Sequence, residues 1–139
     1  MERSLVLIKP DAMERGLGGE IIGRLQKQGL KLLALRMLHL DNEMAGQHYA
    51  VHEGKPFFND LLEYITSTPI IASVFQGENA IETIRKTMGV TDPSKAEAGT
   101  IRADFGLDIQ RNATHASDSP ETARTEIALF FNEDEIFDY

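Results

Sequence analysis

Cysteine is absent from all 139 residues of the sequence. Disulfide bonds, thiolate nucleophiles and cysteine-based zinc sites are therefore excluded. No apolar run approaches the roughly 18–20 residues that a membrane-spanning helix requires, so we expect no membrane segment. The first residues also lack a basic stretch followed by an apolar one, which argues against a secretory signal. From these absences we expect a cytoplasmic protein.

Positive charge is also scarce, because 22 acidic residues outnumber 14 lysines and arginines and give a net charge of −8. This excess argues against a general nucleic-acid-binding surface, although a few cations in one cleft can still bind phosphate. A glycine-rich phosphate loop of the form G-x-x-x-x-G-K-[ST] is missing as well. What remains is a chain with 42% hydrophobic residues, enough for the core of one domain spanning residues 1–139.

The chain alternates between strand-like and helix-like patterns. Residues 4–8 form a short apolar run that indicates a buried central strand, and Lys9-Pro10-Asp11 ends it in a turn. A long segment rich in glycine, aspartate and threonine covers residues 90–110, and such loops in compact domains commonly carry function. The predicted strands are residues 4–8, 30–40, 69–75 and 113–116, and the predicted helices are residues 18–28, 41–51, 57–65, 78–88 and 119–131.

This order, with the additional helices set aside, is β-α-β-β-α-β. It is typical of the ferredoxin-like arrangement, in which two split β-α-β units form one sheet. The pattern alone is also compatible with other α+β or α/β folds, so the fold class needs further support.

One segment, Arg111 to Pro120, combines a histidine with a strong helix start. Ser119 is a good N-cap residue, and Pro120 suits the first helical position. Neutral imidazole is nucleophilic near neutral pH, so His115 is a candidate nucleophile in a chain without cysteine. Taken without its surroundings, a single histidine more often packs inside the protein and bonds a carbonyl group.

The surrounding residues favour the first interpretation, because the chain resembles the nucleoside diphosphate kinase family. Asn112-x-x-His115 followed by Ser-Asp is similar to the family's active-site signature. Residues 4–11, 52–58 and 91–105 resemble its first strand, nucleotide loop and phosphate-binding loop, and the likeness runs from about residue 3 to 131. The resemblance implies an α+β, ferredoxin-like fold: a four-stranded antiparallel sheet with helices packed on it and a long nucleotide-binding loop.

The resemblance also implies an activity, transfer of the γ-phosphate of a nucleoside triphosphate, mainly ATP, to nucleoside diphosphates. In this ping-pong reaction His115 carries the phosphoryl group between the two nucleotides. Glu126 orients its ring, with Ser117 and Tyr49 nearby. The resemblance also implies the nucleotide contacts. It assigns the sugar 3′-hydroxyl to Lys9 and Asn112, and the transferring phosphate to Lys9 as well. Other phosphate contacts are assigned to Arg85, Thr91 and Arg102, and the base to Phe57, Leu61 and Ile109.

Metal and partner requirements follow from the same likeness. Mg²⁺ should arrive with the nucleotide, held by phosphates and waters, and Asp118 could touch it through water. Family members assemble as tetramers or hexamers, so we expect a homotetramer or a homohexamer. His48 and His52 have i, i+4 spacing, a possible metal pair on a helix, but no third ligand is evident in the sequence. We therefore expect them to be surface or hydrogen-bonded histidines.

Two other functions are compatible with the same fold. One is a non-catalytic nucleotide-binding regulatory module, against which the intact set of candidate catalytic residues argues. The other is a phosphohistidine carrier in a protein relay. An aromatic ring suited to base stacking, at Phe57, and the sugar-binding pair Lys9 and Asn112 favour small nucleotides over a protein partner.

Overall fold

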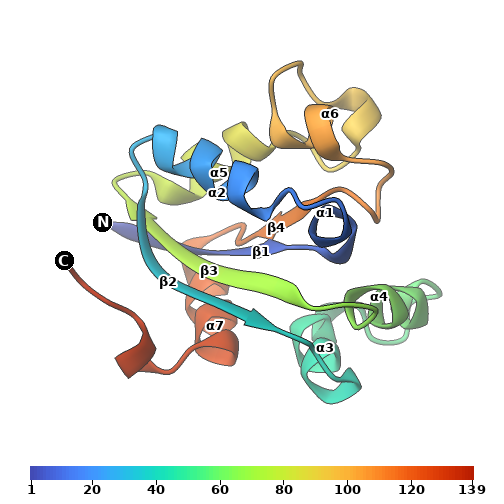
Figure 1. Ribbon diagram of the computed structural model, residues 1–139. Coiled ribbons are helices and arrows are strands. Elements are labelled where there is room, and N and C mark those ends of the chain that lie inside the picture. Colours follow the sequence, from blue (N-terminus) through green and yellow to red (C-terminus); the bar gives the residue numbers. More distant parts are fainter.

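The computed structural model describes residues 1–139, and its centre is one four-stranded sheet (Figure 1). The strands are β1 (Glu2–Ile8), β2 (Lys31–Leu38), β3 (Ile70–Gly77) and β4 (Thr114–Ala116). Their order across the sheet is β2-β3-β1-β4, and every neighbouring pair is antiparallel. Together with the order of helices between the strands, this topology confirms the predicted ferredoxin-like α+β fold.

Helices cover both faces of the sheet (Figure 1). On one face lie α2 (Gly18–Lys27) and α5 (Ala80–Met88); on the other lie α3 (Asn42–His48), α4 (Phe58–Ile65) and α7 (Pro120–Phe130). Successive side chains of a strand point to opposite faces, so a strand covered on both sides must be apolar throughout. This explains the continuous apolar run of β1, in which Leu5, Val6, Leu7 and Ile8 are all fully buried in one or the other of two core clusters.

Two short helices were not anticipated from the sequence. The predicted Lys9-Pro10-Asp11 turn is instead the start of α1 (Pro10–Glu14), with Pro10 in the first turn. Within the predicted loop 90–110 lies α6 (Ile101–Phe105), capped by Thr100, whose hydroxyl accepts a bond from the Ala103 amide. Five residues are too few for a period to show in the sequence. Short 3-10 turns also occur at Ala50–His52, Pro93–Lys95 and Glu133–Glu135.

The predicted helix starts and stops agree closely with the structure. Asp41 caps α3 through a 2.8 Å bond from the Met44 amide, and Ser119 caps α7 through a 3.1 Å bond from the Thr122 amide. Helix α3 ends at His48, three residues earlier than expected, and continues as a 3-10 turn. No helix of the protein is long and apolar enough to cross a bilayer.

Gly89 closes α5 and connects it to the 90–110 segment. Its backbone has a φ of 87°, which favours glycine, and a Cβ atom added there would lie 2.6 Å from the Thr100 hydroxyl oxygen. Its carbonyl oxygen accepts a bond from the Arg102 guanidinium at 3.0 Å. The glycine therefore allows the close approach of α6 to the end of α5.

The Gly89→Ala substitution should destabilise the protein more than Gly99→Ala. Both positions have positive φ, so both variants carry backbone strain of about 1–3 kcal/mol. Only Gly89→Ala adds a clash, since nothing lies within 4 Å of a Cβ at Gly99. Urea denaturation of the two variants measures the difference in free energy of unfolding. Equal losses would show that strain alone, and not contact with Thr100, requires glycine at this position.

Candidate active site

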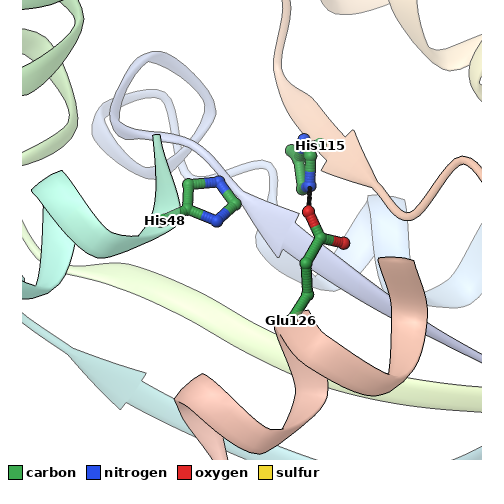
Figure 2. Close-up of side chains that lie close together, drawn as sticks. All are labelled: His48, His115 and Glu126. Carbon is green, nitrogen blue, oxygen red and sulfur yellow. Dashed lines mark hydrogen bonds and ion pairs between the residues drawn. The ribbon is translucent and has the colours of Figure 1, made fainter. Parts of the chain in front are cut away.

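His115 lies in the middle of β4, the short edge strand, where it pairs with Leu7 of β1. Its ring is half-buried, and Nε2 lies 2.8 Å from Oε2 of Glu126 on α7 (Figure 2). Helix α7 begins four residues after β4 and packs back against β1, which brings Glu126 to the strand. The other ring nitrogen, Nδ1, has no hydrogen-bond partner in the protein and points away from the carboxylate (Figure 2).

The Glu126 carboxylate is held through both of its oxygens. Besides His115 at Oε2, the Ser117 hydroxyl donates to Oε1 at 2.7 Å and itself accepts a 3.1 Å bond from the Leu5 amide of β1. Burial raises the pKa of Glu126, but the His115 bond and charge, followed by the Ser117 bond, more than offset this and lower the pKa below its usual value. An ionised carboxylate only accepts, so Nε2 carries the hydrogen and Nδ1 keeps its lone pair.

His48 is a site residue that the sequence analysis missed. Its ring meets the His115 ring edge-on, with centroids 4.8 Å apart, and also lies 4.6 Å from the Tyr49 ring and 5.6 Å from the Phe130 ring. Neither of its ring nitrogens has a partner, although both are buried. The expectation of a surface or hydrogen-bonded histidine was therefore wrong for His48. The only sequence signal was its adjacency to Tyr49, which the family resemblance already placed near His115.

Lys9 joins the end of β1 to the long loop. Its buried ammonium group donates to Oδ1 of Asn112 at 2.8 Å and to the carbonyl of Gln110 at 2.7 Å. The Asn112 side-chain amide in turn donates to the Thr91 carbonyl at 3.0 Å. Burial lowers the pKa of Lys9 to about 8, against the opposing charge of Asp11. Three of the predicted nucleotide contacts thus belong to one hydrogen-bonded group.

Ala113 is held in a strained conformation between Asn112 and the start of β4. Its φ is 74°, the only positive value among non-glycine residues of the chain. Its carbonyl accepts a 2.9 Å bond from the Lys9 amide, and its own amide donates to Asp11 at 3.1 Å. The Tyr64 hydroxyl bonds the other Asp11 oxygen. Such strain persists only where the surroundings fix it, and here bonds to Lys9 and Asp11 hold both backbone groups of Ala113.

Arg102 and Arg85 form a cationic pair without a carboxylate partner. The Arg102 guanidinium is buried and donates to the carbonyls of Gly89 and Thr114 at 3.0 and 2.9 Å, while its Nε atom has no partner. Burial, followed by the charge of Arg85 at the exposed end of α5, lowers the pKa of Arg102 to about 10. Two neighbouring guanidinium groups that lack a carboxylate are suited to bind an anion such as a phosphate.

The remaining predicted residues lie apart from this network. Phe57 and Ile109 expose 44% and 62% of their surface, unusually large fractions for apolar side chains, and are therefore free to contact a ligand. Leu61 is half-buried one turn after Phe57 on α4. Asp118 is exposed and forms no hydrogen bond or ion pair with the protein. No hydrogen bond or ion pair joins these four residues to His115.

A hollow of about 450 Å³ lies elsewhere on the surface, between the N-terminal residues and α7. None of the predicted nucleotide-contacting residues lines it. The candidate active site is therefore defined by the hydrogen-bonded groups around His115 and Lys9, and not by this hollow.

Comparison with known proteins identifies the family. A family model described as nucleoside diphosphate kinase matches residues 2–136. The chain belongs to the nucleoside diphosphate kinase family. It is 58% identical over all of its 139 residues to a nucleoside diphosphate kinase of Dehalococcoides mccartyi, strain BAV1, and covers 98% of that protein. It is 55% identical, again over its full length, to that of Archaeoglobus fulgidus and covers 92% of it.

Solved structures of nucleoside diphosphate kinases have the same fold. The enzyme of Aquifex aeolicus gives a TM-score of 0.95 at 45% identity, over 98% of this chain and 99% of its own. The enzyme of Halobacterium salinarum, solved in complex with CDP, gives a TM-score of 0.96 at 45% identity, over 99% and 92% of the two chains. The chain is therefore a phosphotransferase that acts on nucleotides, as the sequence analysis predicted.

The activity of this nucleoside diphosphate kinase should fall as pH rises through about 8. Lys9 is the cation whose pKa burial lowers to about that value, so at higher pH it becomes neutral and can no longer attract phosphate. The pH profile of kcat/KM should show this decline in the wild-type enzyme, and the decline should be absent in Lys9→Gln. An identical decline in both enzymes would assign it to another group.

Proposed function

We propose that the enzyme transfers the γ-phosphate of a nucleoside triphosphate, mainly ATP, to nucleoside diphosphates through a phosphorylated His115. The observation that carries this proposal is the 2.8 Å pairing of Nε2 with Glu126, which leaves Nδ1 unpartnered. A lone pair on Nδ1 and a fixed ring are what a nucleophile requires. The sequence and the structures of family members support the nucleotide substrates, and the Halobacterium salinarum protein binds CDP.

In the first half-reaction, Nδ1 of His115 attacks the γ-phosphorus. The new N–P bond forms as the bond to the β,γ-bridging oxygen breaks, and that electron pair leaves on the diphosphate. The His115 ring becomes cationic, and the ionised Glu126 stabilises this charge through Nε2–H. In the second half-reaction, a terminal oxygen of another diphosphate attacks the same phosphorus, and the electron pair of the N–P bond returns to Nδ1.

The remaining residues bind and orient the nucleotide. The cations Arg85 and Arg102, with Thr91, would neutralise the phosphates, because guanidinium groups donate to phosphate oxygens in pairs. Lys9 and Asn112, already bonded to each other at 2.8 Å, would contact the sugar hydroxyl and the transferring phosphate. The exposed ring of Phe57 would stack on the base, with Leu61 and Ile109 beside it. Stacking tolerates any base, which suits a broad range of nucleotides.

Mg²⁺ fits the phosphate-binding part of this site only together with the bound nucleotide. Asp118 is the one carboxylate proposed near it, and a single exposed carboxylate does not make a protein cage for Mg²⁺. Its side chain has no protein partner and is free to hold a metal-bound water. Mg²⁺ would supply neutralisation of the phosphate charge. We also propose a cytoplasmic homotetramer or homohexamer, as the family resemblance implies.

The alternatives of a regulatory module and a protein-to-protein phosphohistidine carrier have less support. A module that only binds nucleotides would not require the hydrogen bond by which Glu126 orients the His115 ring. A carrier would not require the exposed Phe57 ring or the Lys9–Asn112 pair.

The His115→Gln variant should take up no acid-labile label from γ-labelled ATP and Mg²⁺ because it lacks the attacking nitrogen. Wild-type protein and a His39→Gln control, altered at an exposed histidine, should take up label and release it to GDP as GTP. Peptide mapping of the label identifies the modified residue. Nucleotide binding without labelling of the wild-type protein would instead support the regulatory module. Transfer of label to a protein but not to GDP would support the carrier.

The Glu126→Gln variant should form phosphohistidine more slowly, because it keeps a hydrogen-bond acceptor but loses the charge that stabilises the cationic ring. A hydrogen bond to a charged group contributes about 1.5–3 kcal/mol, which corresponds to a roughly ten- to hundredfold slower rate. Glu121→Gln, an exposed position on the same helix, serves as the matched control. Rapid-quench labelling measures both rates, and equal rates would contradict the role of Glu126.

A further inference from the structure

Three side chains that could ligate a metal meet beside the nucleophile. They are His48 at the end of α3, His115 on β4 and Glu126 on α7 (Figure 2). One ligand atom of each lies within 4.8 Å of the corresponding atoms of the others. The sequence suggested a different pair, His48 with His52, and offered no third ligand. The fold instead brings His115 and Glu126, from distant segments of the chain, next to His48.

His48 is the residue that phosphoryl transfer does not explain. Both of its ring nitrogens are buried, and neither forms a hydrogen bond. Buried polar atoms are almost always satisfied, so two unpartnered nitrogens in one ring indicate a missing ligand or strain. The ring meets the His115 ring edge-on, with centroids 4.8 Å apart, and one of its nitrogens lies within 4.8 Å of a Glu126 carboxylate oxygen.

These ligand atoms, two ring nitrogens and one carboxylate oxygen, suit Zn²⁺ or a similar transition-metal dication. Two imidazoles and one carboxylate, with a fourth position open, form a common zinc site, whereas Mg²⁺ prefers oxygen ligands and water. Bonds of about 2.0–2.1 Å in tetrahedral geometry place ligand atoms about 3.4 Å apart. The present separations, 2.8 Å from His115 to Glu126 and up to 4.8 Å within the group, bracket that value.

We propose that His48, His115 and Glu126 bind one transition-metal dication, with Zn²⁺ as the representative, in the enzyme free of nucleotide. The metal occupies Nε2 of His115 and replaces the hydrogen bond to Glu126. In the neutral ring the hydrogen then resides on Nδ1, which loses the lone pair that would attack phosphorus. This consequence rests on the proposed function: the metal blocks the nucleophile by reversing its tautomer, and so inhibits transfer.

The first test measures binding of Zn²⁺ alone by equilibrium dialysis on the full-length chain. The chain offers four histidines and no cysteine, so few competing sites exist. We expect one site, and the affinity should fall at least about tenfold in His48→Gln and in Glu126→Gln. His52→Gln and His39→Gln, which alter the other two non-catalytic histidines, should bind as the wild type does. Unchanged affinity in His48→Gln, or an equal loss in His52→Gln, overturns the proposal.

A second measurement needs no substitution and is independent of any folding defect in a variant. Nitrogen-15 spectra of the histidine rings should show Zn²⁺ moving the resonances of His48 and of Nε2 in His115, with those of His39 and His52 unchanged. Unperturbed His48 resonances at saturating metal overturn the proposal.

A third measurement separates the two proposals. Formation of phosphohistidine from γ-labelled ATP with Mg²⁺ should slow at least tenfold when the Zn²⁺ site is saturated. Undiminished labelling with the site occupied overturns the inhibition. If the protein takes up no label even without Zn²⁺, the phosphotransfer mechanism fails, while the dialysis and the ring spectra still decide the metal site.

Discussion

The active site depends on the antiparallel pairing of β4 with β1. Only three residue pairs form this ladder, from Val6 with Ala116 to Ile8 with Thr114. Pairing at this register sets His115 opposite Leu7, and it places the end of β1 beside the segment that precedes β4. Lys9 and Asn112 are therefore neighbours although more than one hundred residues separate them. A shift of one residue would move every side chain of β4 to the other face of the sheet.

This short ladder is reinforced from both ends. Before it, Asp11 accepts the amide of the strained Ala113, and the Lys9 amide bonds the same residue's carbonyl. After it, the Ser117 hydroxyl links the Leu5 amide to Glu126. Each end thus ties β1 to a group of the candidate active site. The same contacts that keep an edge strand of three residues in place also orient the candidate nucleophile and lie beside the bonded pair Lys9 and Asn112.

The site contains polar groups that the protein itself does not satisfy. Arg102 keeps a buried Nε without a partner, Arg85 stands beside it without a carboxylate, and both nitrogens of His48 are unpartnered. Unsatisfied buried groups destabilise a fold unless a ligand or water completes them. These unsatisfied groups lie near β4 and away from the hollow at α7, and they are the observations on which the proposed anion and metal sites rest.

The sequence by itself determined the elements whose signals are local. The apolar run of β1, the Asp41 and Ser119 caps and the glycine that ends α5 are all read from neighbouring residues, and the family likeness predicted the chemistry of His115. Only the tertiary structure decided the rest: helices α1 and α6, which are too short to show a period, and the position of His48. Helical spacing predicts which residues share one face of a helix, but not which other elements that face packs against. The partner of His48 is set by how α3, β4 and α7 pack on the sheet, which is a property of the whole fold.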